Sequence, residues 1–429
     1  MNMEHVRLGD ICTKIGSGAT PAGGKEAYKG GDYKLVRSQN VLDLKFSKEG
    51  LAEINDEQAK KLKNVTLCEN DVLLNITGDS VARSCLVPKE ILPARVNQHV
   101  SIIRPQKDIL DSYYLLCYLQ VNKEYLLALA STGSTRNAIT KEMIEKLKIQ
   151  FPPLSTQQKI SSILSTYDTL IENNAKRIRL LEQMAENLYK EWFVRFRFPG
   201  HENVEMEQSK YGKVPSIFKF IKMQDAFDSY VGGGWGEDES SNEFSEEASV
   251  IRGADFPNVW HYDISSCPRR YHKKSNYKAR QLEDGDIVME ISGGTSEQPV
   301  GRTVLITQDL IDRFEGGRVI CASFCKLLRL RKDVISPYYF YYWMKFLYDT
   351  RIIDRFQLQS TGIINFKFDP FLRKGDIMLP STEVMEAFEK QVRAIHKQMN
   401  KLSHQNKLLA HQRDILLPRL MSGKLEVKP

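Results

Sequence analysis

Residues 160–192, ISSILSTYDTLIENNAKRIRLLEQMAENLYKEW, decide the architecture of this chain. Mostly apolar side chains recur along them at alternating steps of four and three residues, and residues 388–416 (FEKQVRAIHKQMNKLSHQNKLLAHQRDIL) repeat the pattern. The positions on the two seams are Ile160, Leu164, Tyr167, Ile171, Asn174, Ile178, Leu181, Ala185, Leu188 and Trp192, then Phe388, Val392, Ile395, Met399, Leu402, Asn406, Leu409, Arg413 and Leu416. This spacing is typical of helices that supercoil around one another. The sequence therefore predicts two long helices packed as a coiled coil.

The two seams belong to an internal duplication. Phe388 follows Ile160 by 228 residues (388 − 160), slightly more than half of the 429-residue chain. Residues 71–78 (DVLLNITG) match residues 286–293 (DIVMEISG), and residues 101–104 match residues 326–329. Each half then continues with an aromatic segment, a polar loop, a proline-containing strand end and the long helix. Such self-similarity predicts one scaffold built twice.

Composition indicates a globular chain of two or more domains, with 27% charged and 41% hydrophobic residues. A formal net charge of +7 is compatible with nucleic-acid binding but does not demonstrate it. The seven cysteines are scattered without a metal-binding spacing, which favours reduced thiols and a cytoplasmic location. The most apolar stretch, residues 337–348, is too short to span a bilayer, so we expect a buried aromatic helix there.

The two seams predict an antiparallel register. If Trp192 faces Phe388, every layer pairs an a position with a d position, and Asn174 faces Asn406. A parallel register would instead place Asn174 against Leu402, and an unsatisfied buried amide costs about 1–3 kcal/mol. We hypothesise that the asparagine pair fixes the register. The alternative interpretation is that both asparagines are solvated at fraying layers.

The ends of the helices carry recognisable signals. Ser155 to Gln158 has the S-x-x-Q form of a capping box, which predicts the start of the first helix. Ser381 supplies a hydroxyl cap for the second helix. We expect this second helix to break at Pro418 and Gly423.

No catalytic constellation is apparent. Residues 18–25 (GATPAGGK) look like a phosphate loop but lack its spacing, and Glu26 stands where Ser or Thr is needed. No amino-methyltransferase box and no HExxH motif occur, so the chain is predicted not to be an enzyme.

Polar loops with side chains suited to base edges and phosphates occur at matched places in both halves. In the first half the candidate DNA-binding residues are Lys25, Arg37, Ser38, Gln39, Asn40, Thr77, Gly78, Arg83, Arg95, Asn97, Gln98, Ser131, Thr132, Gly133 and Arg136. In the second half they are Arg252, Arg269, Arg270, Lys273, Lys274, Ser292, Gly293, Arg302, Arg318, Thr361 and Gly362. An acidic run at residues 237–247 would repel phosphate, so we expect it away from DNA or in a flexible loop.

Several segments carry a family resemblance. They are residues 153–160 (PLSTQQKI), 188–194 (LYKEWFV) and 416–425 (LLPRLMSGKL), together with the loop at residues 131–134 and the strand entry at residues 285–287. In their order, spacing and duplication, these segments resemble the specificity (S) subunit of type I restriction–modification systems.

This resemblance implies an α+β fold with two target-recognition domains, each a mixed sheet with small helices, separated by two long helices packed as an antiparallel coiled coil. The expected boundaries are 1–152 for the first recognition domain, 153–198 for the first conserved helix, 199–380 for the second recognition domain and 381–429 for the second helix and tail.

The resemblance also implies a non-catalytic subunit that reads a bipartite, asymmetric site in double-stranded DNA. Its expected partners are two methyltransferase subunits and the restriction subunits. S-adenosylmethionine, ATP and magnesium would belong to those partners, and this chain would bind no cofactor or metal itself.

One departure and two alternatives stay open. The second helix opens with Ser381-Thr382-Glu383 and lacks the glutamine-rich form of the first, so methyltransferase docking could be less symmetric than the fold. The chain could instead be a coiled-coil adaptor that binds only proteins, or part of a fused restriction–methylation enzyme. The missing methyltransferase box argues against the second alternative.

Overall fold

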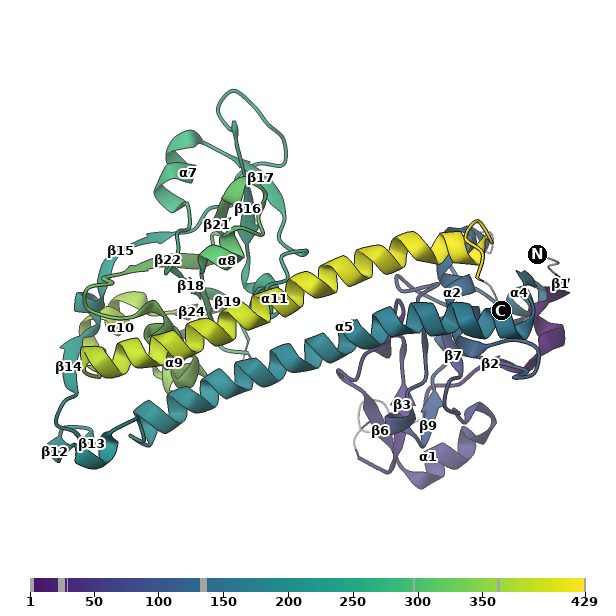
Figure 1. The fold of residues 1–429 in the computed structure, drawn as a ribbon, viewed down its shortest axis with the longest axis horizontal. Helices are drawn as coiled ribbons and strands as arrows, with labels where there is room; N and C mark the ends of the chain where they lie inside the picture. The colour runs from purple at the N-terminus through teal and green to yellow at the C-terminus, as the bar shows by residue number, and fades with distance from the viewer. Residues whose placement is uncertain are drawn as a thin grey trace. The chain divides into compact units, whose positions relative to one another are not determined.

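The computed structural model describes residues 4–21, 28, 30–131, 137–295, 298–360 and 363–427. The chain divides into two compact units (Figure 1). The first unit contains residues 1–170 and 408–429, and the second contains residues 171–407. In the described residues, no helix is both long and apolar enough to cross a membrane.

The helices of the first unit are short except where the two long helices enter it. They are α1 (Asp56–Lys61), α2 (Ser112–Val121), α3 (Lys123–Ser131) and α4 (Lys141–Lys146). The second unit contains α6 (Phe256–Val259), α7 (Lys274–Arg280), α8 (Gln308–Ile311), α9 (Pro337–Asp349) and α10 (Phe368–Lys374). The long helices, α5 (Leu154–Tyr189) and α11 (Thr382–Met421), each contribute one end to each unit.

The long helices run antiparallel in both units. In the first unit, Ile160 near the start of α5 shares a buried apolar cluster with Leu420 near the end of α11. In the second unit, Trp192 just beyond α5 packs on Phe388 near the start of α11, with ring centroids 5.9 Å apart. Both pairs belong to the predicted register, so the predicted antiparallel coiled coil is confirmed.

Each unit is built on a four-stranded antiparallel sheet. In the first unit the order is β2-β10-β7-β8, beside a three-stranded sheet β6-β3-β9 and the pairs β1-β11 and β4-β5. The strands are β1 (Glu4–Arg7), β2 (Cys12–Ser17), β3 (Tyr33–Val36), β4 (Val41–Leu42), β5 (Lys45–Phe46), β6 (Ala52–Ile54), β7 (Val72–Asn75), β8 (Ser84–Leu86), β9 (Ala94–Val96), β10 (Val100–Pro105) and β11 (Lys148–Phe151).

The second unit repeats this order as β15-β22-β18-β20, β17-β16-β21 and β14-β25, and adds β19-β24-β23 and β12-β13. The strands are β12 (Met206–Ser209), β13 (Gly212–Pro215), β14 (Lys219–Lys222), β15 (Phe227–Gly232), β16 (Glu246–Ile251), β17 (Arg269–His272), β18 (Ile287–Glu290), β19 (Ser292–Gly294), β20 (Thr303–Leu305), β21 (Val319–Cys321), β22 (Cys325–Leu330), β23 (Gln357–Ser360), β24 (Ile363–Phe366) and β25 (Asp376–Leu379). Even the one parallel pair recurs, as β3 with β9 and β16 with β21.

Individual hydrogen bonds recur as well. Arg104 on β10 forms two charge-assisted bonds with Asp71, which ends the turn before β7. Arg329 on β22 makes the same two bonds with Asp286 before β18. Both aspartates also accept a backbone N–H three residues upstream. The duplication inferred from the sequence therefore extends to the anchoring ion pair of each sheet.

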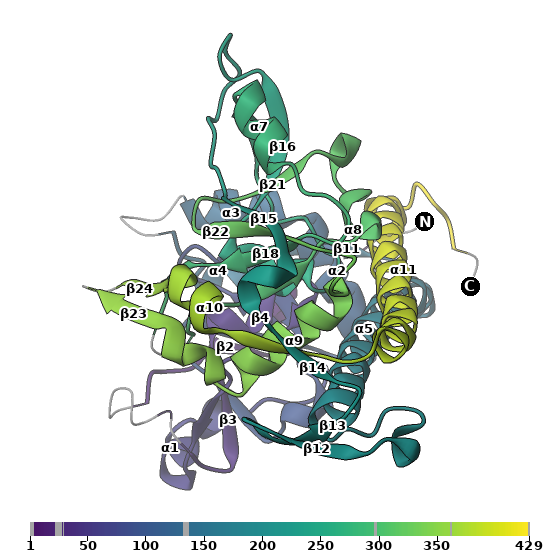
Figure 2. The same ribbon diagram turned by 90° about the vertical axis from the view of Figure 1, so that its left-hand side faces the viewer.

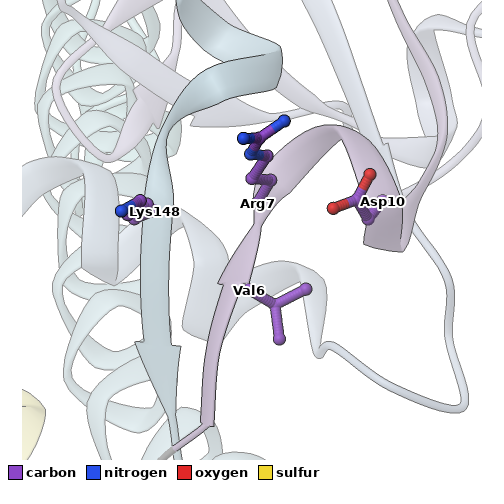
Figure 3. Close-up of a pocket in the computed structure, with 4 residues that line it drawn as sticks. All are labelled: Val6, Arg7, Asp10 and Lys148. Carbon is purple, nitrogen blue, oxygen red and sulfur yellow. The ribbon is translucent and has the colours of Figure 1, made fainter.

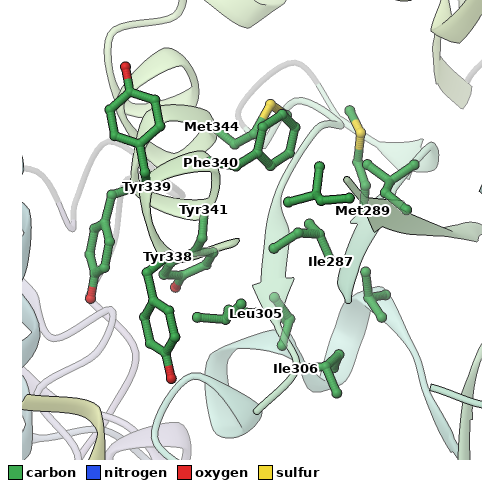
Figure 4. Packing of buried hydrophobic residues seen from close by; sticks show 14 of the residues in the cluster. Ile287, Met289, Leu305, Ile306, Tyr338, Tyr339, Phe340, Tyr341 and Met344 are labelled. Carbon is green, nitrogen blue, oxygen red and sulfur yellow. The ribbon is translucent and has the colours of Figure 1, made fainter. Parts of the chain in front are cut away.

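The core of the second unit lies between its main sheet and the aromatic helix α9, as expected for residues 337–348 (Figure 4). Phe340 and Met344 face the strands that carry Ile287 and Met289. On another side of α9, Tyr339 packs edge-on against Phe193, with centroids 4.8 Å apart. The aromatic helix thus joins the sheet to the long helices of its own unit.

Two expectations about helix ends are wrong. The amides of Thr156 and Gln157 donate to the carbonyl of Pro153, so α5 begins at Leu154 and Ser155 lies inside its first turn rather than capping it. Pro418 does not break α11, which continues to Met421 before Gly423 turns with φ +70°. Proline so near the end removes only the bond to the carbonyl four residues earlier. Leu417 and Leu420 are buried in an apolar cluster of the first unit, and this packing stabilises the last turn of α11.

The asparagine hypothesis stays a prediction. Asn174 is buried, and the amide of Asn406 donates to the backbone carbonyl of Ile171 at 3.2 Å, one turn before Asn174. Both residues belong to the second unit. Asn406 therefore donates its described hydrogen bond to a backbone carbonyl of the facing helix and not to Asn174.

A buried polar network joins the globular part of the second unit to the segments of the long helices that it contains. His396 of α11 is buried between the hydroxyls of Tyr262 and Tyr342, each at 2.9 Å. Burial lowers the pKa of His396 to about 4. Burial alone would raise the pKa of Glu182, but its bond with His261 and the nearby charge of Lys345 lower it to about 2.

We expect this network to make the second unit sensitive to acid. Both folded-state pKa values lie below the ordinary values of 6.5 and 4.5, so the stabilisation is present at neutral pH. It should be lost as pH falls, first from about 6.5 to 4 through His396 and then below 4.5 through Glu182. The His396 contribution is on the order of 3 kcal/mol. Denaturant melts at pH 7 and pH 5 test this, and His396→Leu should remove most of the difference.

Candidate nucleic-acid interface

In the first unit, loops far apart in the sequence meet at one end of the main sheet. The amide of Asn75 at the end of β7 donates to the carbonyl of Ser38 at 2.9 Å. The next residue, Ile76, donates its N–H to the carbonyl of His99 at 3.0 Å and accepts one from Ile139. We call residues 37–40, 76–80 and 97–99 the first loop cluster. It brings together the predicted residues Ser38, Thr77, Gly78, Asn97 and Gln98.

A chain of side-chain hydrogen bonds crosses the first loop cluster. Thr20 donates to Oε1 of Gln98 at 2.5 Å, Gln98 Nε2 lies 2.8 Å from His99 Nε2, and His99 Nδ1 lies 2.6 Å from the hydroxyl of Thr77. Because the Gln98 amide nitrogen can only donate, His99 Nε2 accepts and its proton sits on Nδ1. The Thr77 hydroxyl and the second Gln98 N–H then remain available as donors to a ligand.

Other predicted residues of the first loop cluster are used within the protein. Asn40 is fully buried, and its amide donates to the carbonyls of Ser47 and Glu49 at 3.0 Å. Arg37 and Gln39 both donate to the carbonyl of Gly50. Their described bonds shape the loop, with Gln39 exposed and Arg37 half-buried.

The second unit has an equivalent cluster, residues 252–255, 291–294 and 322–324, which we call the second loop cluster. Ile291 donates its N–H to the carbonyl of Phe324 at 2.9 Å and accepts one from Phe366. These bonds match those of Ile76 with His99 and Ile139. The hydroxyl of Ser292 donates to Asn365 at 2.6 Å. Predicted residues Arg252, Ser292 and Gly293 lie here.

Two glycines, Gly18 from the segment that looks like a phosphate loop and Gly233, pack beside these clusters. A Cβ on Gly18 would lie 1.8 Å from the carbonyl oxygen of Val96, and one on Gly233 would lie 2.1 Å from that of Ala322. Glycine is therefore required for the loop to approach the strand end that leads into His99 or Phe324. This close contact accounts for both glycines without a bound phosphate.

The predicted arginines of the second half all have acidic partners. The pairs are Arg252 with Asp255, Arg269 with Glu247 and Glu315, Arg270 with Asp238, Arg302 with Glu290, and Arg318 with Glu246. Lys273 also pairs with Glu243, whereas Lys274 is exposed at the start of α7. Figure 2 shows α7 beside β16, the strand that carries Glu246 and Glu247.

The acidic run is therefore not a detached loop. Glu246 and Glu247 lie on β16, which pairs antiparallel with the basic strand β17, and Asp238 and Glu243 reach Arg270 and Lys273. Residues 238–245 form a loop that these ion pairs tie to the basic stretch, and the expectation that the run lies away from DNA stays a prediction. Phosphate binding by that stretch stays a prediction, now with its charge largely matched inside the unit.

The two units differ at one matched arginine. Arg302 forms a bidentate pair with Glu290 on β18, and both side chains are buried, at 8% and 6% exposure. Burial opposes the charge of Arg302, but the bonds with Glu290 raise its pKa. In the first unit, backbone bonds place Asn75 and Arg83 at these positions. Asparagine cannot neutralise a cation, and within the described part of the chain Arg83 has no acidic partner.

The remaining predicted residues lie elsewhere or outside the described residues. Arg95 is buried on β9, where it donates to the carbonyls of Ala59 and Ala94, and burial lowers its pKa. The hydroxyl of Ser131 donates to Ala128 within α3. The predicted residues that fall outside the described part are Lys25, Thr132, Gly133, Arg136, Thr361 and Gly362.

The charges differ at another matched place, the β1-β11 pair, which borders an open hollow (Figure 3). Arg7 faces Lys148 across the two strands, with Asp10 nearby. At the equivalent place in the second unit, Lys222 faces and binds Asp376. Hydrogen bonds from Lys210 and Lys222 lower the pKa of Asp376. The hollow is shallow, and among the described residues no cluster of His, Cys, Asp or Glu could hold a metal there or elsewhere.

Two residues at the clusters are absent from the predicted set. Thr20, which bonds to the first loop cluster from outside it, carries no sequence signal, because only the fold brings it to Gln98. Phe324 carries one, since matching residues 101–104 with 326–329 places it at the position of His99.

Comparison with known proteins agrees with this duplicated architecture. Residues 1–183 match the family model described as "Type I restriction modification DNA specificity domain". The MjaVIII specificity subunit of a type I restriction enzyme from Methanocaldococcus jannaschii is 27% identical over 292 residues, which cover 67% of this chain and 63% of that protein. The crystal structure of the type I S subunit from M. genitalium covers 98% of this chain and 96% of its own, at 16% identity and a TM-score of 0.55.

Residues 1–183 therefore match the DNA specificity domain of type I restriction–modification systems, and the chain is similar to specificity subunits of such systems. Another similar protein, the HindI specificity subunit of Haemophilus influenzae, is 29% identical over 167 residues, 38% of this chain and 36% of that protein. The chain spans a little under two thirds of the MjaVIII subunit, 63%. The likeness to the M. genitalium S subunit extends along nearly the whole chain and concerns the fold.

Proposed function

We propose that this chain is a type I specificity subunit, which reads a bipartite, asymmetric DNA site and does not itself catalyse methylation or cleavage. One observation carries the proposal: the same loop cluster is built twice on the same sheet with different side chains at matched positions. A duplicated scaffold with divergent tips suits a target with two unlike halves. The chain would act in the cytoplasm, where double-stranded DNA is accessible.

The proposal includes assembly. Two methyltransferase subunits would dock on this chain, joined by restriction subunits, and S-adenosylmethionine, ATP and magnesium would be bound by those partners. The long helices offer exposed apolar side chains, among them Leu180 and Met184 on α5, that a partner could cover. At the helix openings, Gln157 is buried with bonds to Asp111, Ile109 and Pro152, whereas Met385 accepts from Ser336 at the matched place.

Methylation mapping tests this function directly. Adenine methylation is mapped by long-read sequencing in cells with and without the gene, with the partner subunits expressed in both. Loss of one bipartite motif upon deletion is the expected result. An unchanged methylome with expressed partners contradicts the proposal and favours an adaptor that binds only proteins.

The first unit should supply more of the phosphate attraction than the second. Arg83→Gln, assayed in the assembled methyltransferase complex, is expected to weaken binding to all duplexes and to lower the salt slope of log K by about 1. Arg269→Gln is the matched control, because Arg269 already pairs with Glu247 and Glu315. Equal slopes for wild type and Arg83→Gln would contradict this assignment.

A further inference from the structure

The two loop clusters carry opposite chemistry at one matched position. His99 and Phe324 occupy the same place, because each accepts a backbone N–H from the residue that follows the central strand, Ile76 or Ile291. His99 belongs to a chain of polar side chains. Phe324 is 62% exposed and has no polar group in its side chain. An exposed phenylalanine at a loop tip loses contact with water only when a partner covers it.

The surroundings of Phe324 leave it accessible. Gly293 has φ +99°, and a Cβ built on it would lie 3.9 Å from the Phe324 ring, with no other heavy atom within 4 Å. A larger residue at this position would press on the ring and be strained in this backbone conformation. The neighbouring Ser323 is also exposed. The aromatic face is therefore bordered by small residues, which allows a close approach by a ligand.

We propose that Phe324 is a specificity-determining residue of the second unit and contacts the 5-methyl group of a thymine. This inference rests on the proposed DNA-reading function. The matched position in the first unit presents hydrogen-bonding groups suited to base edges. An aromatic side chain cannot form conventional hydrogen bonds with base edges. The apolar group that it can contact in the major groove is the 5-methyl group of thymine.

A uracil scan tests the contact. The probe is a duplex that carries the motif found by methylation mapping, with each thymine in turn replaced by deoxyuridine, which lacks only the methyl group. Binding of the full methyltransferase complex is measured with wild-type and Phe324→Ala subunits. One uracil substitution should weaken wild-type binding about fourfold, the value of burying one such group. The same substitution should not weaken binding of the Phe324→Ala complex further.

The controls separate failure of this inference from failure of the proposed function. Tyr211→Ala removes an aromatic side chain of similar exposure, 60%, outside the loop cluster, and should retain the wild-type uracil response. Phe324→Leu should retain part of it. If wild type selects the motif but Phe324→Ala responds to every uracil as wild type does, the thymine contact is refuted. If Phe324→Ala weakens binding to all sequences alike, Phe324 is a general contact or wedge and the inference also fails. A wild-type complex that selects no motif would instead refute the proposed function.

Discussion

Glu290→Gln is expected to destabilise the second unit by about 3–5 kcal/mol, the usual cost of removing one partner of a buried ion pair. One of the two oxygens that accept from Arg302 becomes an NH2 group facing the guanidinium. The charge of Arg302 then lies buried without compensation. The carbonyl of Gly253 still accepts a hydrogen bond from Arg302, but it is neutral and cannot balance the charge of the guanidinium.

Tryptophan fluorescence during denaturation measures this effect. All four tryptophans of the chain, Trp192, Trp235, Trp260 and Trp343, belong to the second unit, so the signal reports that unit alone. The exposed pair Arg331–Asp333 provides a control, since Asp333→Asn should change stability by less than about 1 kcal/mol. Replacing Glu290 and Arg302 together by methionine should recover most of the loss. A midpoint for Glu290→Gln equal to that of wild type would contradict the prediction.

Phe388→Ala is the second large prediction, with an expected loss of about 3–5 kcal/mol. Phe388 is fully buried at the start of α11 and packs edge-on against Phe193, with centroids 4.9 Å apart, and against Tyr342 at 6.0 Å. Truncation leaves a cavity among aromatic rings that cannot collapse easily, because several belong to different elements. The same fluorescence melt measures the loss.

Leu180→Ala is the matched control for Phe388→Ala. Leu180 also lies on a long helix, but its side chain is 64% exposed. Its truncation should change stability by no more than about 0.5 kcal/mol. Comparable losses for the two variants would mean that the aromatic layer at Phe388 does not hold the helices together.

The parts of the fold that sequence could predict are those set by a repeating period. Trp192 and Phe388 lie on seams whose positions are spaced alternately four and three residues apart. Such a seam specifies how the helices pair independently of the loop sequences. Local signals near helix ends were less reliable, because long-range contacts decide them. The side-chain amide of Gln157 donates to the carbonyls of Ile109 and Pro152. The helix continues through Pro418 because Leu417 and Leu420 pack in the apolar cluster of the first unit.

The site was harder to predict because side-chain partners come from distant positions. Arg302 looks like a base reader until the hairpin of β18 and β20 brings it to Glu290, and the basic strand β17 looks free until β16 pairs with it. Arg83 remains a candidate phosphate contact, because the first unit has Asn75 where the second unit has Glu290, and asparagine does not neutralise the arginine. The fold brings together the predicted loops at Thr77 and Gln98, and the hydrogen-bonded order of their side chains follows only from the fold; their role in DNA binding stays a prediction.

The ion pairs between β16 and β17 have a consequence for titrations with salt. Exposed pairs such as Arg269–Glu247 are screened by added ions just as contacts with phosphate are. Added salt would therefore weaken the ion pairs between β16 and β17, while its cations compete with the protein for the DNA phosphates. An affinity curve for the intact subunit would then combine ion uptake by the protein with ion release from the duplex, and its slope would understate the number of phosphates contacted.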